Sequence, residues 1–521
     1  VRFNGTLGPV IAQGRNAMPD LRRLSPGDFS FYGFDHRMRE VEEALAKVAI
    51  RDGEPKVKVV EDGVIVPTSV VHQGGSHRYH GGVLDREGHP VEVAYLRRTG
   101  DTMIAGIPGP ATVTPACEID EEVVYLGWLQ SHHYGLFLLE SLMRAWFLRE
   151  VDPRGRVMFN MTGQYPPEGN IRRLLDVFGI PKERMLIPSA PTRVRRILVP
   201  EPLYELYYGG HERAAEPFRA AAAKILEAAD GTSSGQPVYL SRGRLTSDRR
   251  IIIGEAELEE LLRQNGFLVV YPETMTLDEQ VLLFNRHTDI FACVGSAAHT
   301  VLFALNAPHL HLLTAGTPMP EFFLVPALAG ARVTFVSCLG EESDHTFPRF
   351  LSLPTLVDYL DNRGFLTKRP GTDQLAVRLA GVHERYHEAW FCAFVRKATA
   401  TGTTLSPDIE LEARRLAATS WPMSWILARH YAASDPTRSG QMAVHFAELL
   451  AAESDPERIA HRHKELVLGA LYVIEATAST LGQAAAKRLV QVLVDRDGLN
   501  SAVRSRAQRI VAEAHPSRLE Q

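Results

Sequence analysis

Small residues and arginines follow two apolar runs near the middle of the chain. Ser241 ends the first run, at residues 238–241, Arg242 follows it, and Arg250 lies a few positions further on. The second run leads into a loop of small residues, VGSAAH at 294–299. Guanidinium groups bind phosphate oxygens in pairs, and the N–H groups of a helix N-terminus attract anions. Together the loops predict a diphosphate site, although each by itself also fits a solvated basic loop or a tight packing turn.

Residues 383–387 read HERYH, which matches the HExxH pattern of zinc metalloproteases. On a helix, His383 and His387 lie one turn apart on one face with Glu384 beside them, as zinc requires. Glu410 is the nearest downstream carboxylate at a suitable distance for a third ligand, but no supporting motif surrounds it. So short a pattern arises easily by chance. We therefore favour an amphipathic helix face and keep zinc hydrolysis as a remote alternative.

Two histidines alternate along a predicted strand near residue 310. His309 and His311 point to the same side of such a strand, because strand side chains alternate with a period of two. Packing, or lining a cleft, is the expected role of this pair rather than metal binding.

Several common enzyme motifs are absent from the sequence. It has neither a Walker loop nor a GxGxxG fingerprint, so a P-loop triphosphatase and an NAD-binding enzyme lack support. Its GxSxG letters, GTSSG at 231–235, lie in a Ser/Gly-rich break and not in a strand-to-helix elbow, which disfavours an α/β-hydrolase.

The composition bounds the class of protein. Of 521 residues, 45% are hydrophobic and 23% charged, which excludes wholesale disorder. The net charge of −5 argues against a general nucleic-acid binder. The four cysteines form no CxxC pair, so we expect neither a disulfide framework nor a cysteine zinc site. No run reaches the roughly 18 apolar residues that cross a bilayer, and residues 1–16 lack the apolar core of a signal peptide. We expect a cytoplasmic protein.

The elements that must position these residues begin with a region rich in turns. Residues 1–120 carry short strands, with hairpins expected around residues 61–63 (EDG) and 86–88 (REG). Residues 121–235 then alternate short apolar runs with helical patterns, including an apolar helix over about 133–150. Such alternation is typical of parallel strands in an α/β fold.

A Ser/Gly-rich break at residues 230–237 is a plausible linker, and the alternation restarts beyond it. The helix that opens at Glu255 is expected to end at Gly266, because acidic residues suit its first turn and glycine suits the position after its last. Two α/β units joined by a hinge predict two Rossmann-like domains with a ligand in the cleft between them. The Ala- and Leu-rich residues 371–521 predict an α-helical extension.

As one string, residues 239–305 resemble glycosyltransferase family 61, which includes bacterial capsular polysaccharide enzymes and eukaryotic xylosyl- and N-acetylglucosaminyltransferases. The matching residues are Ser241, Arg242, Arg249, Arg250, Glu255, Gly266, Phe267, Pro272, Glu273, Leu277, Glu279, Gln280, Gly295, Ser296 and Phe303. Residues 133–148 (HYGLFLLESLMRAWFL) resemble a second family segment, Asn-Tyr-Gly-His-Phe-Leu-Leu-Glu, with Leu136 in place of its His. The resemblance covers about residues 75–345.

The resemblance implies a GT-B fold, in which two Rossmann-like domains face each other. Residues 1–120 would form a β-rich region packed on the acceptor-side domain of residues 121–235, and residues 236–370 would bind the donor. The implied reaction moves a sugar from a nucleotide-sugar donor, expected to be UDP-linked, to an acceptor hydroxyl with inversion, in polysaccharide or glycan biosynthesis. The implied donor-binding residues are Ser241, Arg242, Arg250, Glu273, Gln280, Gly295, Ser296, Ala297 and His299.

Family resemblance also implies a base that deprotonates the acceptor hydroxyl. The candidates are His133, His132 and Glu140, each with a structural role as its alternative. For Glu140 that role is a buried carboxylate paired with Arg144, four residues on. An arginine-based diphosphate site needs no metal and no Asp-x-Asp pair occurs in the α/β region, so we expect no metal and no other cofactor.

A second class of function stays open, namely a catalytically silent GT-B-like scaffold that binds partners, for which Leu136 is the main argument. For the transferase, the expected partners are the nucleotide-sugar donor and a glycan, lipid-linked or protein acceptor. We expect no nucleic acid and no transmembrane segment, although a peripheral place at the inner membrane face fits a lipid-linked acceptor. The helical residues 371–521 are a candidate surface for a homodimer or a protein partner.

Overall fold

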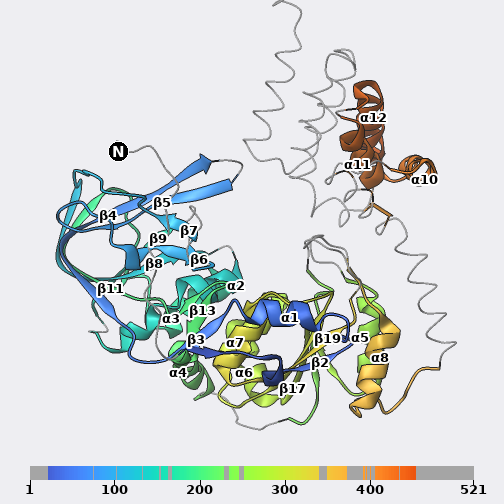
Figure 1. Ribbon diagram of the computed structural model, residues 1–521, viewed down its shortest axis with the longest axis horizontal. Helices are drawn as coiled ribbons and strands as arrows, with labels where there is room; N and C mark the ends of the chain where they lie inside the picture. The colour runs from blue at the N-terminus through green and yellow to red at the C-terminus, as the bar shows by residue number, and fades with distance from the viewer. Residues whose placement is uncertain are drawn as a thin grey trace, which may run out of the picture. The chain divides into compact units, whose positions relative to one another are not determined.

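The computed structural model describes residues 21–73, 76–100, 102–131, 133–151, 154–161, 167–227, 234–245, 252–339, 349–371, 405–432 and 434–452, with residues 391, 392, 395 and 399. The protein is a mixed α/β structure with several sheets (Figure 1). Two compact units divide the chain. The first comprises residues 1–241, 258–341 and 354–369, and the second comprises residues 242–257, 342–353 and 370–521.

The first unit contains an eight-stranded sheet. Its strands run in the order β10 (Met185–Leu186), β9 (Arg156–Met161), β8 (Cys117–Leu129), β11 (Thr192–Pro200), β4 (Val57–Gln73), β5 (Ser76–Leu84), β7 (Thr102–Gly106) and β6 (Leu96–Arg98). β8 to β11 pair in parallel, as the alternation of apolar runs predicts, whereas β4 lies antiparallel to β11. Strands from both sides of residue 120 thus share one sheet, because β4 pairs directly with β11.

The first expected hairpin is wrong, because the chain does not turn at residues 61–63. β4 continues through them, and its antiparallel register with β11 is unbroken there, with Gly63 opposite Val194 and Glu61 opposite Arg196.

The second expected turn closes a short antiparallel hairpin, in which Leu84 is bridged to Pro90 and the Val91 N–H donates to the Val83 carbonyl at 2.9 Å. The Asp85 carboxylate accepts hydrogen bonds from the backbone N–H groups of Glu87 and His89, at 3.1 and 2.8 Å. The strand that follows, β6, pairs with β7 and not with β5. Local sequence therefore predicted both the turn and its hairpin.

The apolar segment expected as one helix is a series of short helical turns. It contains α2 (Tyr134–Leu136), the π-helical turn η3 (Phe137–Ser141) and the 3₁₀ turn η4 (Ala145–Arg149). Every residue of η3 is buried. A helical segment enclosed on all sides needs no hydrophilic face, which explains why its sequence is apolar nearly throughout.

A second sheet in this unit has six strands, all parallel. Their order is β16 (Leu268–Val270), β14 (Val238–Leu240), β17 (Asp289–Cys293), β18 (His309–Thr314), β19 (Arg332–Ser337) and β2 (Ser30–Tyr32). The five strands from β14 to β19 lie where the sequence predicts them. Counted along the chain they have the order 2-1-3-4-5, which reverses direction between β14 and β17, the point where open α/β sheets bind ligands.

Helical elements connect these strands. They are α5 (Glu255–Gln264), α6 (Leu277–Arg286), the 3₁₀ helix η8 (Ser296–Phe303) and α7 (Glu321–Ala329). α5 is followed by Gly266 at φ 82°, which confirms the expected helix end. α6 begins with a capping box, in which Thr276 and Glu279 bind each other's backbone N–H groups.

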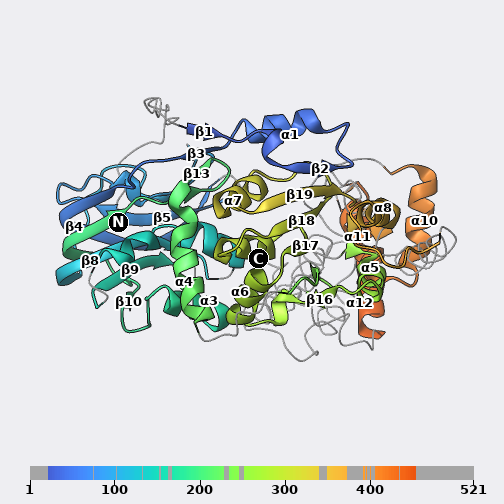
Figure 2. The ribbon, with the colours of Figure 1, turned by 90° about the horizontal axis from the view of Figure 1, so that it is seen from below.

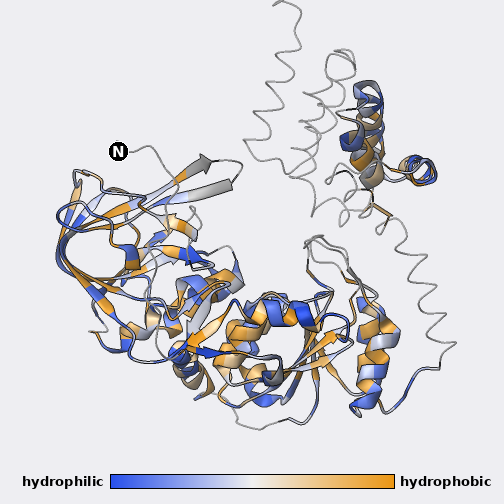
Figure 3. Cartoon of the chain, in the orientation of Figure 1, coloured by the Kyte–Doolittle hydropathy of each residue, from blue (hydrophilic) through white to orange (hydrophobic). Residues whose placement is uncertain are grey.

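The N-terminal residues contribute to a different sheet than expected. β2 pairs with β19 at the edge of the six-stranded sheet, and Phe31 stacks on Phe335 with ring centroids 5.6 Å apart. The first 120 residues therefore do not form one separate region beside residues 121–235. After β2, α1 (Met38–Leu45) buries Val41 and Leu45 and exposes charged residues, as its two colours in Figure 3 show.

A small four-stranded sheet completes the strands of the first unit. Its order is β1 (Leu21–Arg23), β3 (Ala49–Arg51), β13 (Gly209–His211) and β12 (Tyr204–Glu205), and β1, β3 and β13 lie together along one side in Figure 2. One hydrophobic core joins elements of both larger sheets. Within it Phe218 of α4 (Glu216–Leu226) meets Phe303 of η8 edge to face, with centroids 5.2 Å apart.

The second unit is largely helical where it is described, as the sequence predicts. It contains α10 (Pro407–Ala417), α11 (Trp421–Tyr431) and α12 (Pro436–Ala452), with the short parallel strands β15 (Ile252–Ile253) and β20 (Arg349–Phe350). Residues 383–387 lie outside the described residues. Across the part of the chain that the structure describes, no helix is long and apolar enough to cross a membrane.

Candidate functional site

Two of the predicted donor-binding segments lie at the carboxyl ends of β14 and β17. These strands are neighbours in the sheet, with Leu240 paired to Ala292. Ser241 follows β14 directly, and Gly295 follows β17 by two residues. The segments therefore flank the point where the strand order reverses, which is the expected ligand position of such a sheet.

Ser241 is a buried part of a polar network. Its hydroxyl donates to Oε1 of Glu259 at 2.5 Å, and Oε2 accepts from Tyr271 at 2.6 Å and from Arg263 at 2.8 Å. Burial raises the pKa of Glu259, but these hydrogen bonds outweigh it and leave the pKa below its usual value. The carboxylate is therefore ionised at neutral pH and fixes the loop after β14.

Arg242 belongs to the second unit. Its backbone N–H donates to Oε1 of Glu255 at 2.8 Å, and Glu255 is buried at the start of α5. The two family-matched residues thus hold the loop and the helix start together. Arg250, the other predicted diphosphate ligand, lies outside the described residues.

The loop after β17 packs against α2. A Cβ added to Gly135 would lie 2.8 Å from Ser296 Oγ and 3.2 Å from Ser296 Cβ. The Tyr134 hydroxyl and Thr300 Oγ1 are 3.1 Å apart and share a hydrogen bond. A glycine is therefore needed at position 135 for this approach, which brings the predicted base segment to the predicted donor loop.

His133 caps α2 and faces this contact. Its Nδ1 accepts the Leu136 N–H at 3.1 Å. A neutral imidazole that accepts at Nδ1 carries its proton on Nε2, so in this arrangement His133 offers a hydrogen-bond donor there. His132, the second candidate base, lies outside the described residues.

His299 lies one turn into η8 and is buried. Its ring stacks on Phe322 of α7 with centroids 5.1 Å apart. Burial, and then the neighbouring His133, lower the pKa of His299 to about 3. The imidazole is therefore uncharged at neutral pH and can meet an anion only as an N–H donor.

The remaining predicted donor residues have different surroundings. Glu273 is exposed in the turn η7 (Pro272–Thr274). Gln280 is buried, and its Nε2 donates to the carbonyls of Pro272 and Met275 at 2.9 and 3.3 Å, so it holds that turn in place. Ala297, Gln280 and Leu240 line the same small hollow, which brings the turn, the loop after β17 and the end of β14 together.

Glu140 is engaged by a partner that the sequence did not predict. Arg98 of β6 donates to Oε1 at 2.6 Å and to Oε2 at 3.0 Å, and Gln130 also donates to Oε2. The alternative role of Glu140, a pair with Arg144, is wrong in its partner, because Arg144 donates instead to the carbonyls of Pro200, Val93 and Tyr95. Burial raises the pKa of Glu140 although Arg98 opposes the shift.

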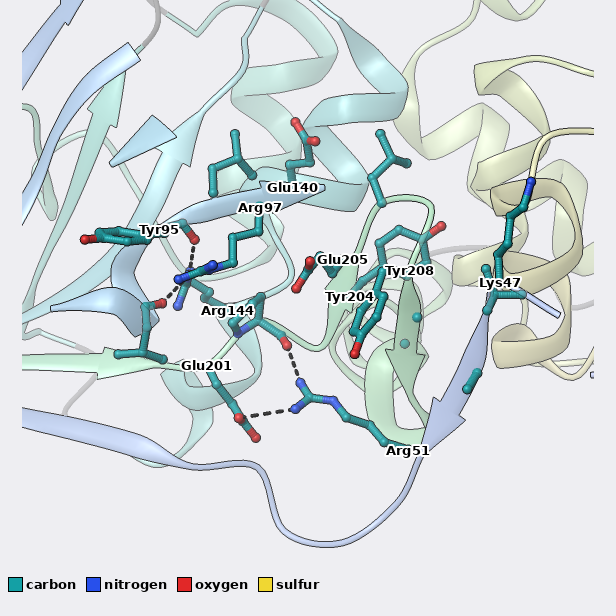
Figure 4. A pocket seen from close by; sticks show the side chains of 18 of the residues that line it. Lys47, Arg51, Tyr95, Arg97, Glu140, Arg144, Glu201, Tyr204, Glu205 and Tyr208 are labelled. Carbon is teal, nitrogen blue, oxygen red and sulfur yellow. Dashed lines mark hydrogen bonds and ion pairs between the residues drawn. The ribbon is translucent and has the colours of Figure 1, made fainter. Parts of the chain in front are cut away.

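A cavity of about 510 Å³ lies beside Glu140 (Figure 4). Strands of the eight- and four-stranded sheets line it, and its walls carry aromatic and charged side chains, among them Tyr95, Arg97, Trp128, Tyr204, Glu205 and Tyr208. Arg51 is fixed at its edge by Glu201 and the Pro202 carbonyl, at 3.3 and 2.6 Å. Buried Trp128 Nε1 and Tyr204 Oη have no hydrogen-bond partner among the described residues.

Sequence reasoning missed Glu321, the first residue of α7. It is 5% exposed, and its Oε2 has no hydrogen-bond partner among the described residues. Burial raises the pKa of Glu321 to about 7, although its own backbone N–H and Arg98 lower it. The sequence signal was weak, since an acidic residue at a helix start is usually explained by its favourable interaction with the helix dipole.

Glu321 interacts electrostatically with one part of the site, and the residue next to it in the chain contacts the other. On one side it acts electrostatically on Tyr204 and on Arg98, the partner of Glu140. On the other side the next residue, Phe322, stacks on His299 behind the donor loop. A carboxyl group that titrates near neutral pH in such a position is typical of a functional site.

Comparison with protein families adds an independent finding. Residues 132–310 match the family model Glycosyltransferase 61. The match runs from the start of the α2 segment into β18, so it contains α2, the loop after β14, the turn η7 and the loop after β17. This match confirms the resemblance to glycosyltransferase family 61 over residues 132–310, and it supports a glycosyltransferase enzyme. No curated protein matches the chain.

Proposed function

We propose that the protein transfers a sugar from a nucleotide-sugar donor, expected to be UDP-linked, to the hydroxyl of a glycan, lipid-linked or protein acceptor. The observation that carries this proposal is the contact of Gly135 with Ser296, which joins the acceptor-side segment to the donor loop. The proposal includes a GT-B arrangement of two facing domains and inversion at the anomeric carbon. It also includes independence of metal, and acceptor and donor roles for the two α/β regions.

The donor diphosphate would bind at the carboxyl ends of β14 and β17. Arg242 and Arg250 would compensate its charge, and the N–H groups from Gly295 to Ala298 would add hydrogen bonds. The Ser241–Glu259 network supports this role, because it fixes the loop before any ligand arrives.

The acceptor would enter the cavity beside Glu140. Aromatic rings stack on the apolar faces of sugars. A buried donor without a partner, such as Trp128 Nε1, destabilises the empty site, and a sugar hydroxyl that accepts its hydrogen bond removes that cost. The cavity holds both kinds of group. Glu140, in the wall of the cavity, lies on the same chain segment as His133 and Gly135. This segment connects the cavity to the donor loop.

We assign the base role to Glu321. A base needs a free lone pair and a pKa near the working pH. In Glu140 both oxygens accept from Arg98, and in His133 Nδ1 accepts from the backbone, whereas Glu321 keeps an unpartnered oxygen. Glu321 would take the proton of the acceptor hydroxyl while the hydroxyl oxygen attacks the anomeric carbon from the face opposite the diphosphate. The C–O bond to the diphosphate breaks, and the nucleotide leaves with the bonding electrons.

Nucleotide binding tests the donor site. A panel of UDP, GDP, CMP and dTDP, with and without EDTA, should give one metal-independent ligand by thermal shift. Arg242→Ala should weaken that binding at least about tenfold, since a charge-assisted contact is worth roughly 1.5–3 kcal/mol. Arg195→Ala, which removes an exposed arginine of β11, is the control. Binding of none of the nucleotides would contradict the transferase reaction proposed here and favour the silent scaffold.

Sugar transfer tests the base. Glu321→Gln should retain nucleotide binding and lose most transfer, because the amide cannot accept the proton. Glu87→Gln, an exposed carboxylate, should change neither. Full transfer by Glu321→Gln would return the base role to His133 or His132.

A further inference from the structure

Three ligand-type side chains converge at the amino-terminal edge of the six-stranded sheet. Asp289 and His309 are the first residues of β17 and β18 and are partners in the parallel register. His311, two residues on, points to the same face as His309. The donor loops begin at the opposite, carboxyl edge, so this cluster is separate from the site described above.

The spacing of the ligand atoms is close to that of a zinc site. His311 Nε2 lies 3.2 Å and His309 Nδ1 lies 3.8 Å from the same Asp289 oxygen, Oδ1. The three atoms all lie within 4.8 Å of one another. Zinc bonds of about 2.0–2.1 Å in a tetrahedron hold ligand atoms roughly 3.3 Å apart. Small side-chain adjustments would therefore bring all three within bonding distance of one ion.

The atoms that would not bind the ion are already held by hydrogen bonds. His311 Nδ1 lies 2.6 Å from the Tyr359 hydroxyl of α8 (Leu353–Asn362), and His309 Nε2 lies 2.8 Å from Thr334 Oγ1. Asp289 Oδ2 accepts from Thr288 at 2.8 Å. Metal-binding histidines commonly have such a partner on the second ring nitrogen, which fixes the ring and leaves the first nitrogen for the metal.

The cluster is accessible, and its charge suits a cation. The side chains of Asp289 and His309 are 28% and 17% exposed, whereas His311 is buried at 1%. Burial, then the neighbouring His311, and then Arg332 and Arg363 lower the pKa of His309 to about 4. Both arginines are exposed, and water screens their repulsion of an ion.

We propose that Asp289, His309 and His311 bind a divalent transition-metal ion, with Zn²⁺ the best fit to two imidazole nitrogens and one carboxylate oxygen. The ion joins β17 to β18 and leaves one coordination position for water. It stabilises the sheet at the edge away from the donor loops, so the metal-independent transfer proposed above is unaffected. The proposal rests on this geometry and not on the transferase reaction.

The test is metal binding to the full chain after treatment with a chelator. One equivalent of Co²⁺ should give the visible absorption of a nitrogen- and oxygen-ligated ion, and Zn²⁺ should displace it and raise the melting temperature. His309→Gln should weaken binding at least about tenfold, and Tyr359→Phe, which removes the hydroxyl that contacts His311, by up to about tenfold. A melting curve of His309→Gln in the presence of chelator shows whether that variant folds. If it does not, Asp289→Asn serves as the second ligand variant.

Two controls make the result decisive. His287→Gln removes a half-buried histidine near the same edge whose Nδ1 contacts the Gln236 carbonyl, and it should bind Co²⁺ as the wild type does. His383→Gln removes the HExxH pattern and should also leave binding unchanged. Three results would each overturn the proposal: loss of binding in His383→Gln, unchanged binding in both ligand variants, or no metal binding by the wild type.

Discussion

At the scale of single residues, the chemistry of the site depends on which polar atoms are already occupied. Glu140 and Ser241 were both expected to act on substrates. Arg98 engages the carboxylate of the first, and Glu259 accepts from the hydroxyl of the second. Glu321 retains an unpartnered oxygen. Occupied groups position a site and unoccupied ones can react, so the acid–base assignment follows from a hydrogen-bond inventory that the sequence does not contain.

The raised pKa of Glu321 predicts a pH-dependent stability. Its folded pKa of about 7 exceeds the ordinary value of 4.5 for a glutamate, so the contribution to the free energy of unfolding is fully present below pH 4.5 and is lost as the pH rises through 7. The loss amounts to about 3 kcal/mol, because one pKa unit corresponds to about 1.4 kcal/mol. Denaturation of Glu321→Gln at pH 5 and pH 8 should show a flatter dependence than the wild type. Equal slopes would contradict the pKa shift.

The ion pair of Arg98 and Glu140 predicts a large effect of breaking it from one side. Arg98→Ala leaves a buried carboxylate without its cation, which typically costs about 3–5 kcal/mol. Arg98→Ala combined with Glu140→Gln should recover part of that loss, since the charge is then gone. Urea denaturation of the two single variants and the double variant measures the coupling. Additive losses would show that the pair does not act as a unit.

At the scale of elements, the site is made where short segments from different sheets approach. α2 reaches the loop after β17 because position 135 has no side chain, and η8 meets α7 through the stack of His299 on Phe322. The broken helix at residues 134–149 serves the same contact. Its π-helical turn buries Glu140 toward the cavity and leaves His133 at the donor loop.

Gly135→Ala should separate these elements. The new Cβ would meet Ser296 Oγ and Cβ, and such overpacking typically costs about 1–3 kcal/mol. We expect nucleotide affinity to fall, because the donor loop must shift. Adding Ser296→Gly removes both clashing atoms and should restore the melting temperature, whereas Ser296→Gly alone should change it little. Failure of the second substitution to rescue stability would show that the contact is not the cause.

At the scale of the whole molecule, each of the two compact units consists of three separate stretches of the chain. The donor loop after β14 crosses from the first unit to the second between Ser241 and Arg242, and α5 returns to the first at Leu258. The helices of the second unit have hydrophobic clusters of their own, which include Leu427 of α11.

Two units with separate cores predict that unfolding is not two-state. In calorimetry the measured enthalpy should exceed the van't Hoff enthalpy. Leu427→Ala should lower one transition, by about 2–5 kcal/mol in the free energy of unfolding, as is typical of buried leucines. Leu312→Ala, in β18 of the first unit, should lower the other. A single transition that both variants shift equally would contradict independent units.

The sequence by itself determined the order and type of most elements, the two loops after β14 and β17, and the family. These follow from patterns within a few residues, such as the apolar runs, the capping residues around α6 and Gly266 after α5, which local physics fixes wherever the segment lies. Only the tertiary structure decided that residues 61–63 continue a strand, that β2 joins β19, and that Arg98 rather than Arg144 pairs with Glu140. It also decided that Asp289 lies beside His309. Such contacts join residues tens to hundreds of positions apart, and they depend on strand register and on how side chains fill one shared core, which no local pattern specifies.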